Sequence, residues 1–255
     1  MSRLPPLDLH AHISPSIAED ELAALGCVVF AVSRSLEEAA NGLLRHDETT
    51  VWGVGCHPGV GDAHRDFTAT QFDVLLESTA LAGELGLDGK SSVPLDLQIH
   101  TLRSALEVLA RKPRIVSLHS YAATDSVIAE LERFETPGRV LHWWLGDAAL
   151  TRRAVALGCY FSVPPSAVRR QDLLAEIPLD RVLTETDHPF GNRRSSDARP
   201  GGVATVESGL AAHHGIDVDD VRRIMWRNLA QLTQDVGCGR LLPPRIRTIL
   251  AALPR

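Results

Sequence analysis

Six residues that are far apart along the chain are of the types that bind divalent metal ions. His10 and His12 stand one residue apart in the stretch LDLHAHI, directly after an apolar run. If this stretch is a strand, positions i and i+2 point to the same face, so both imidazoles can approach one ion. The other four each lie in or at the end of another short apolar run, and they are Glu84, His119, His142 and Asp187.

Imidazoles and carboxylates together suit divalent ions such as Zn, Mn and Mg. Six ligands exceed the need of one tetrahedral ion, but they are enough for two ions that share a bridging carboxylate. A two-metal site clamps the attacking and leaving oxygens of a displacement reaction and lowers the pKa of a bound water. Because a single histidine at a strand end is usually only a satisfied polar group, this interpretation depends on all six residues meeting in space.

The elements that would bring them together are visible as eight short apolar runs that alternate with longer amphipathic stretches. This alternation is typical of parallel β-α-β units. Eight units in 255 residues predict an α/β fold, a (β/α)8 TIM barrel, and a doubly wound open sheet is the alternative. We expect strands at 7–10, 27–33, 51–57, 81–85, 114–120, 139–144, 159–163 and 181–186.

The stretches between and after these runs predict the helices. No Pro- or Gly-rich linker divides the sequence, so we expect one domain over residues 1–255, with 239–255 as a C-terminal capping segment. In a parallel barrel all strands end at one face, where the active site lies, and the six candidate ligands stand at those ends. We expect helices at 18–25, 35–46, 67–78, 95–111, 122–134, 147–157, 166–176, 203–214 and 217–235.

Composition excludes several other classes of protein. The chain is 44% hydrophobic and 23% charged, with a formal net charge of -6, whereas a protein that binds nucleic acid by bulk charge would be basic. The sequence contains no apolar run of about 18 residues that could span a membrane, and no signal-peptide pattern. The four cysteines form no CxxC pair, so we expect reduced, buried thiols and a cytoplasmic location.

Eight segments, spread over about residues 7–232, carry a resemblance to a known family. In chain order they are LDLHAHI, GVGCHPG, GELGLDG, IVSLHS, VLHWWLG, ALGCYFSV, LDRVLTETDHPF and RNLAQL. Together they resemble the TatD-like metal-dependent hydrolases of the amidohydrolase superfamily. GELGLDG and LTETDHPF are specific when they occur together, whereas an HxH pair alone is shared by many metallohydrolases.

This resemblance implies a barrel with two divalent ions and hydrolysis of DNA phosphodiester bonds, often from the 3′ end of single strands. His10 and His12 would hold the first ion, and His119 and His142 the second. Glu84 would bridge both ions. Asp187 would bind the first ion and act as the base for the nucleophilic water.

The chain also departs from the family pattern near the expected substrate site. Tyr121 stands where many relatives have arginine, HWWLG replaces HCFSG, and GNRRSSDARPGG replaces an asparagine-rich segment. The LHWWLG segment and the short loops are similar to the QatD-type branch, which is associated with bacterial anti-phage defence and implies partner proteins of a defence system. Two alternatives stay open: an amidohydrolase-type enzyme acting on a small molecule or peptide, and a non-catalytic partner-binding subunit of a defence complex.

Five further residues are candidates for substrate contact. Imidazoles and guanidinium groups at the ends of strands can hold phosphates, and a tryptophan there can stack on a base, although turn or surface roles are the alternative. Glu185 could orient a ligand imidazole or, equally, make a structural polar contact inside the barrel. The histidines in helices and loops, such as His64, are expected at the surface. The five substrate candidates are His57, His188, Trp143, Arg193 and Arg194.

Overall fold

All eight apolar runs form strands, and almost every strand residue is buried. Runs of Val, Leu, Ile and Phe suit strands that are covered on both faces. The computed structural model describes residues 4–193 and 197–253. The strands are β1 (Leu7–Ala11), β2 (Val28–Ala31), β3 (Thr50–Trp52), β4 (Leu81–Gly86), β5 (Ile115–His119), β6 (Arg139–His142), β7 (Tyr160–Val163) and β8 (Val182–Thr184).

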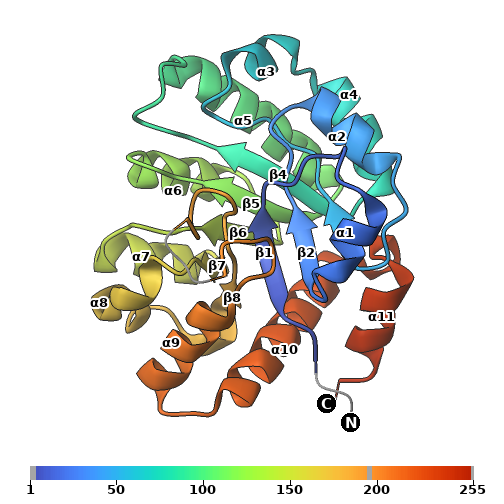
Figure 1. The fold of residues 1–255 in the computed structure, drawn as a ribbon. Helices are drawn as coiled ribbons and strands as arrows, with labels where there is room; N and C mark the ends of the chain where they lie inside the picture. The colour runs from blue at the N-terminus through green and yellow to red at the C-terminus, as the bar shows by residue number, and fades with distance from the viewer. Residues whose placement is uncertain (1–3, 194–196, 254–255) are drawn as a thin grey trace.

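The strands pair in parallel in chain order and close into a barrel (Figure 1). Strands β1 to β3 form one sheet and β4 to β8 another, and two bridges join them: Val54 pairs with Ala82, and Ala11 pairs with His188. The backbone amide of Asp187 donates to the carbonyl of His10 at 2.8 Å, which ties the end of the last strand to the first. The predicted (β/α)8 barrel is confirmed, and the open-sheet alternative is wrong because the two ends of the strand order meet.

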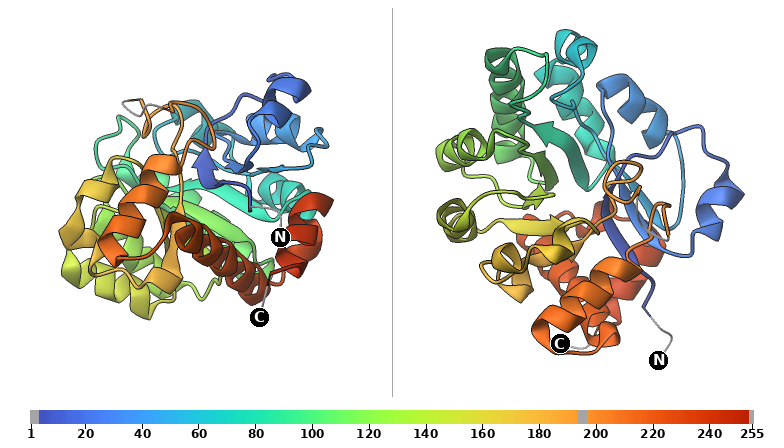
Figure 2. Two further views of the ribbon diagram at one scale, coloured as in Figure 1. Left: turned by 60° about the horizontal axis from the view of Figure 1, so that its bottom comes forward. Right: turned by 60° about the vertical axis from the view of Figure 1, so that its left-hand side comes forward.

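Helices cover the outside of the barrel, and Figure 2 shows this from two further sides. Several begin at a residue whose side chain accepts a hydrogen bond from the first turn, as Ser35 does for Glu38 and Asp147 for Leu150. The helices are α1 (Glu19–Ala24), α2 (Leu36–Leu43), α3 (Gly61–Asp66), α4 (Ala69–Leu75), α5 (Leu95–Arg111), α6 (Thr124–Arg133), α7 (Ala148–Ala156), α8 (Gln171–Leu174), α9 (Ala204–His214), α10 (Val218–Val236) and α11 (Pro244–Ala251), with 3-10 turns η1 (Leu76–Ser78), η2 (Ala167–Arg169), η3 (Leu179–Arg181) and η4 (Gly239–Leu241).

Helix α3 is absent from the sequence prediction, because six residues are too few to show a helical periodicity. It carries His64, which was expected at the surface. That expectation is wrong: His64 is 5% exposed, and its Nδ1 lies 2.8 Å from Oγ1 of Thr101 in α5. The hydroxyl partner satisfies the imidazole inside the protein, so His64 has a structural role.

Helix α10 packs across β1 and β8, where the barrel closes. Its Trp226 is fully buried and donates through Nε1 to the carbonyl of Pro5 at 2.8 Å. Helix α11 packs on α10, and its Ile246 is fully buried in the hydrophobic core. That the chain is one domain with a capping tail stays a prediction. None of the helices in residues 4–193 and 197–253 has the length and apolar character needed to cross a bilayer.

Candidate metal centre

The six predicted ligands meet at the C-terminal mouth of the barrel. They lie in, or just after, five strands that are far apart in sequence, as the parallel arrangement requires. Four of the six are buried, and His12 and His119 are half-buried. The six are His10 and His12 from the end of β1, Glu84 from β4, His119 from β5, His142 from β6, and Asp187 from the turn after β8.

Glu84 lies between two pairs of histidines. Its Oε2 is 3.2 Å from Nε2 of His12 and 3.6 Å from Nε2 of His10. Its Oε1 is 2.9 Å from Nε2 of His142 and 2.6 Å from Nδ1 of His119. The two oxygens of this carboxylate therefore face different imidazoles, an arrangement that suits a carboxylate shared between two cations.

Asp187 completes the group around His10 and His12. Its Oδ1 lies 3.6 Å from Nε2 of His10 and 3.7 Å from Nε2 of His12. The residue has φ of 44°, in the left-handed region, and its carbonyl accepts hydrogen bonds from the amides of Phe190 and Gly191. Burial raises the pKa of the Asp187 carboxyl to about 7, because water no longer stabilises its ionised form.

Buried polar atoms without a partner indicate that the group fits metal ions. Folded proteins rarely leave such atoms unsatisfied, yet Nε2 of His10 and Oε2 of Glu84 have no hydrogen-bond partner. Four sets of three residues bring their ligand atoms within 4.8 Å of one another, and two of these sets consist only of the predicted ligands. The donor types and spacing therefore fit one cation in each of these two sets. The first set is His10, His12 and Asp187, and the second is Glu84, His119 and His142.

The charges within the group oppose one another. Burial alone would raise the pKa of Glu84, but the imidazoles of His57, His142 and His10 hold this pKa well below its usual range. For His142, burial lowers the pKa, whereas Glu84 and Glu185 raise it by more, so that it lies well above its usual value. Glu84 is therefore ionised, which is the form that binds a cation.

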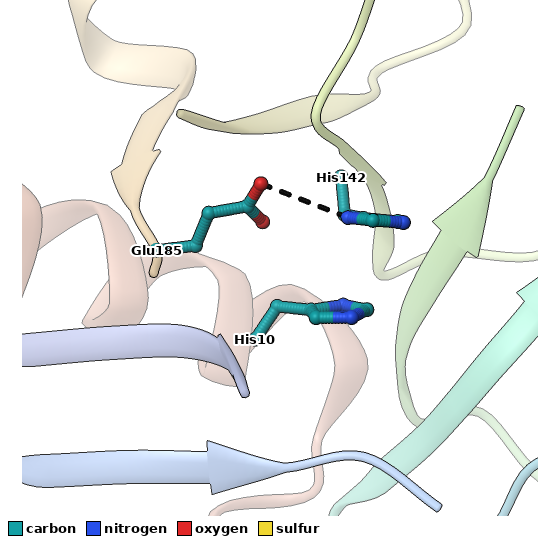
Figure 3. A group of neighbouring side chains, drawn as sticks. All are labelled: His10, His142 and Glu185. Carbon is teal, nitrogen blue, oxygen red and sulfur yellow. Dashed lines mark ion pairs between the residues drawn. The ribbon is translucent and has the colours of Figure 1, made fainter. Parts of the chain in front are cut away.

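Glu185 contacts Nδ1 of His142 (Figure 3), whereas Glu84 contacts Nε2 of the same ring. Its Oε1 lies 3.6 Å from Nδ1 of His142 and accepts the backbone amide of Trp143 at 2.9 Å. Its Oε2 accepts the hydroxyl of Ser162. The imidazoles of His142 and His10 stack with centroids 3.9 Å apart, so Glu185 lies beside one ring of a packed pair.

A second buried carboxylate, Asp8, connects the first strand to the segment after the last one. Its Oδ2 accepts the hydroxyl of Thr186 at 2.6 Å and the amide of Gly201 at 2.8 Å, and its Oδ1 accepts the amide of Thr186 at 2.9 Å. Nδ1 of His10 lies 2.7 Å from Oγ of Ser117, which leaves Nε2 for the mouth of the barrel. These contacts hold the two ends of the barrel together beneath the candidate ligands.

His57, expected as a substrate contact, does face the group. Its Nε2 lies 3.5 Å from Oε2 of Glu84. Its Nδ1 accepts the amide of Gly59 at 2.9 Å, so the neutral ring carries its proton on Nε2. His57 also forms a ligand-sized set with His12 and Glu84, but a protonated Nε2 donates a hydrogen bond instead of binding a cation.

The other predicted substrate contacts are more scattered. Nδ1 of His188 lies 3.2 Å from Oδ1 of Asn192. Trp143 is half-buried and lines a groove beside the candidate ligands, and the exposed Arg193 lines the same groove. Arg194 lies outside the described residues.

Sequence reasoning missed two residues at the mouth, Phe190 and Arg169. The ring of Phe190 lies 5.5 Å from that of His12, centroid to centroid, and Arg169 lines the same groove as Trp143. The position of Phe190 three residues after Asp187 is a signal that could have revealed it. Arg169 is one of many charged residues in a loop, and nothing in its sequence context distinguishes it.

Comparison with known proteins agrees with this geometry. A family model described as TatD related DNase matches residues 7–234. The chain belongs to this TatD family. Its relatives include the uncharacterized metal-dependent hydrolase YjjV of Escherichia coli, 27% identical over 246 residues that make up 87% of this chain and 95% of that protein.

Two further TatD comparisons support the same conclusion. The human deoxyribonuclease TATDN3 is 26% identical over 198 residues, 70% of this chain and 72% of that protein. The crystal structure of E. coli YjjV superposes with a TM-score of 0.79 at 25% identity, covering 90% of this chain and 97% of that one. The resemblance to TatD-like hydrolases is confirmed, and the protein is a metal-dependent hydrolase of this family.

Proposed function

We propose that the protein hydrolyses phosphodiester bonds of single-stranded DNA from the 3′ end, with two divalent cations at the barrel mouth. The observation that carries the proposal is that the two oxygens of Glu84 face two separate sets of ligands. The substrate class is supported by the family description, TatD related DNase, and by the deoxyribonuclease TATDN3 of human. On the similarity of its LHWWLG segment to the QatD-type branch, we place this activity in anti-phage defence.

Each residue then has a defined part in holding the cations, which would be Zn, Mn or Mg. Glu84 would contribute to both positions. Cations bound there would offset the charge on the phosphate and lower the pKa of a water. The first position would be held by His10, His12 and Asp187, and the second by His119 and His142.

Asp187 is the general base of the proposed reaction. It accepts a proton from the water that attacks phosphorus, and the P–O bond to the leaving oxygen breaks as the new P–O bond forms. The proton then passes to the leaving oxygen. His57 donates from Nε2 to a phosphate oxygen, because its Nδ1 is occupied by the amide of Gly59. Four of the candidate ligands are buried, which strengthens these interactions in the transition state.

Replacing Asp187 by asparagine tests the proposal. The change keeps the shape and removes the base, so cleavage of a 5′-labelled single strand in Mn or Mg should fall at least about 100-fold. The matched control is Asp235→Asn, because Asp235 lies at the C-terminal end of α10, where it contacts Gln231. The metal content of each variant, measured by elemental analysis, separates loss of the base from loss of an ion.

The same experiment distinguishes the alternatives. Full activity of Asp187→Asn would contradict the assigned base. A metal-loaded wild-type protein that cleaves amides or lactones but no phosphodiester would favour the amidohydrolase-type enzyme. A wild-type protein that takes up no metal and turns over nothing in added Mn or Mg would favour the non-catalytic subunit.

A further inference from the structure

A groove of about 620 Å³ opens directly beside the candidate metal centre. It runs over the segments that follow β6, β7 and β8. Its size lies within the range of small-molecule binding sites, about 300–1,000 Å³. The residues used below are Trp143, Arg169, Phe190 and Arg193, all of which line it.

Aromatic rings form the end of the groove nearest the proposed ligands. Trp143 directly follows His142, and Phe190 is 47% exposed although it is a large apolar side chain. Phe190 also contacts His12 through its ring, at 5.5 Å between centroids. An exposed ring that touches a proposed ligand offers a flat apolar surface within one nucleotide of the reacting phosphate.

Positive charge occupies the rest of the groove. Arg169 and Arg193 are both exposed, and the guanidinium of Arg193 lies over the ring of Phe190 at 6.0 Å. No carboxylate in the described parts of the chain pairs with either guanidinium. Two arginines without a carboxylate partner among the described residues lie beside a half-buried and an exposed aromatic ring. Single-stranded nucleic acids bind to this combination through their phosphates and stacked bases.

The opposite side of the mouth lacks this chemistry. A second groove of about 700 Å³ lies over the segments after β1, β2 and β3. It is lined by Glu37 and Glu38, and its Arg34 pairs with Glu38 at 3.3 Å. Carboxylates at that side repel a phosphate backbone, so a bound strand is favoured on one side of the metal centre only.

We infer that the groove of Trp143, Arg169, Phe190 and Arg193 binds the nucleotide next to the scissile phosphate of a single strand. The base stacks on Trp143 and Phe190, and the arginines hold the adjoining phosphates. The strand continues over the ends of β6 to β8, away from the carboxylates of the second groove. This inference rests on the proposed phosphodiesterase function and names how that site selects its substrate.

Two substrates separate the groove from the metal centre: a single-stranded oligonucleotide, and methyl p-nitrophenyl phosphate, which has no base. For Trp143→Ala, KM for the oligonucleotide should rise about 5- to 100-fold, the usual effect of losing a stacked base. The kcat/KM for the small diester should fall far less than that for the oligonucleotide, because the diester has no base to stack on the ring. Trp143→Phe, which keeps an aromatic face, should restore most of the affinity.

An abasic nucleotide next to the cleaved phosphate gives a second readout. It should weaken binding to the wild type, and should cause no further loss in Trp143→Ala, because the base and the ring are partners in one interaction. Arg169→Ala should reduce the slope of log KM against log salt concentration by about 0.7. Arg247→Ala is the matched control: Arg247 is an exposed arginine on α11.

The outcomes distinguish the inference from the function on which it rests. If the wild type cleaves neither substrate, the proposed function fails. If it cleaves both, and the oligonucleotide KM and salt slope of Trp143→Ala and Arg169→Ala match those of the wild type, the groove assignment is wrong. An equal loss on both substrates would also overturn it, because that result means damage to the metal centre.

Discussion

Replacing Glu185 by glutamine should weaken the binding of one cation and leave the binding of the other unchanged. The substitution keeps the volume of a fully buried side chain, and its amide oxygen can still accept the hydroxyl of Ser162 or the amide of Trp143. It removes the negative charge 3.6 Å from Nδ1 of His142. That imidazole is a proposed ligand of the second cation only, so the effect should be confined to that position.

The magnitude follows from this distance. Two unit charges 3.6 Å apart attract by about 4–5 kcal/mol at an effective dielectric constant of about 20. A neutral imidazole bound to a cation carries only part of a unit charge, so about 1.5–3 kcal/mol remains. This corresponds to a dissociation constant that is about 10- to 100-fold higher for the second cation, a usual effect of losing a carboxylate behind a ligand histidine.

Competition with a fluorescent chelator measures both dissociation constants. The matched control is Glu132→Gln on α6, where the carboxylate pairs with Arg153 and lies 41% exposed. If both cations bind equally more weakly, or if neither affinity changes, the role given to Glu185 is refuted. A loss of cation affinity of more than about 1,000-fold would show that Glu185 is itself a ligand, because the loss of a positioning residue alone has a smaller effect.

Two further predictions concern stability and thiol chemistry. Gly86 has φ of 134°, and a Cβ there would overlap the backbone of His119. Gly86→Ala should therefore lower the free energy of unfolding, measured in urea, by at least about 2 kcal/mol. A loss below about 0.5 kcal/mol would show that the backbone of β5 can shift at little cost and would contradict this prediction. All four cysteine thiols are free and buried, and burial raises their pKa to about 11 or 12. The native protein at pH 8 should therefore not react with a disulfide reagent, whereas all four thiols of the unfolded chain should react. Reaction of the native protein would contradict this burial. The thiols are Cys27, Cys56, Cys159 and Cys238.

The strands and the convergence of the six candidate ligands follow from local signals. An apolar run that ends in histidine or a carboxylate indicates both a buried strand and the end at which chemistry occurs, as in IVSLHS around His119. The doubly wound alternative could be excluded only by the structure, because closure depends on contacts such as that between Asp187 and His10.

The rest of the site depends on turns that no short pattern specifies. Trp143 and Asp187 both have φ near 40°, and this conformation decides where their side chains point. The groove likewise needs Arg169 and Phe190 from two different segments, and their proximity is a property of the closed barrel. For Glu185, the sequence left a structural role and an orienting role equally open, and only its distance from His142 favours the second.

The contact between the first and last strands has a consequence for how the protein is made. The Asp8 carboxylate accepts hydrogen bonds from Thr186 and Gly201, and the carbonyl of His10 accepts one from the amide of Asp187. The proposed first cation position therefore includes residues from both ends of the strand order. A growing chain cannot form that position until residue 187 has emerged and the barrel has closed. Uptake of the first cation would then follow completion of the fold, and a truncated or open chain would carry no working hydrolytic centre.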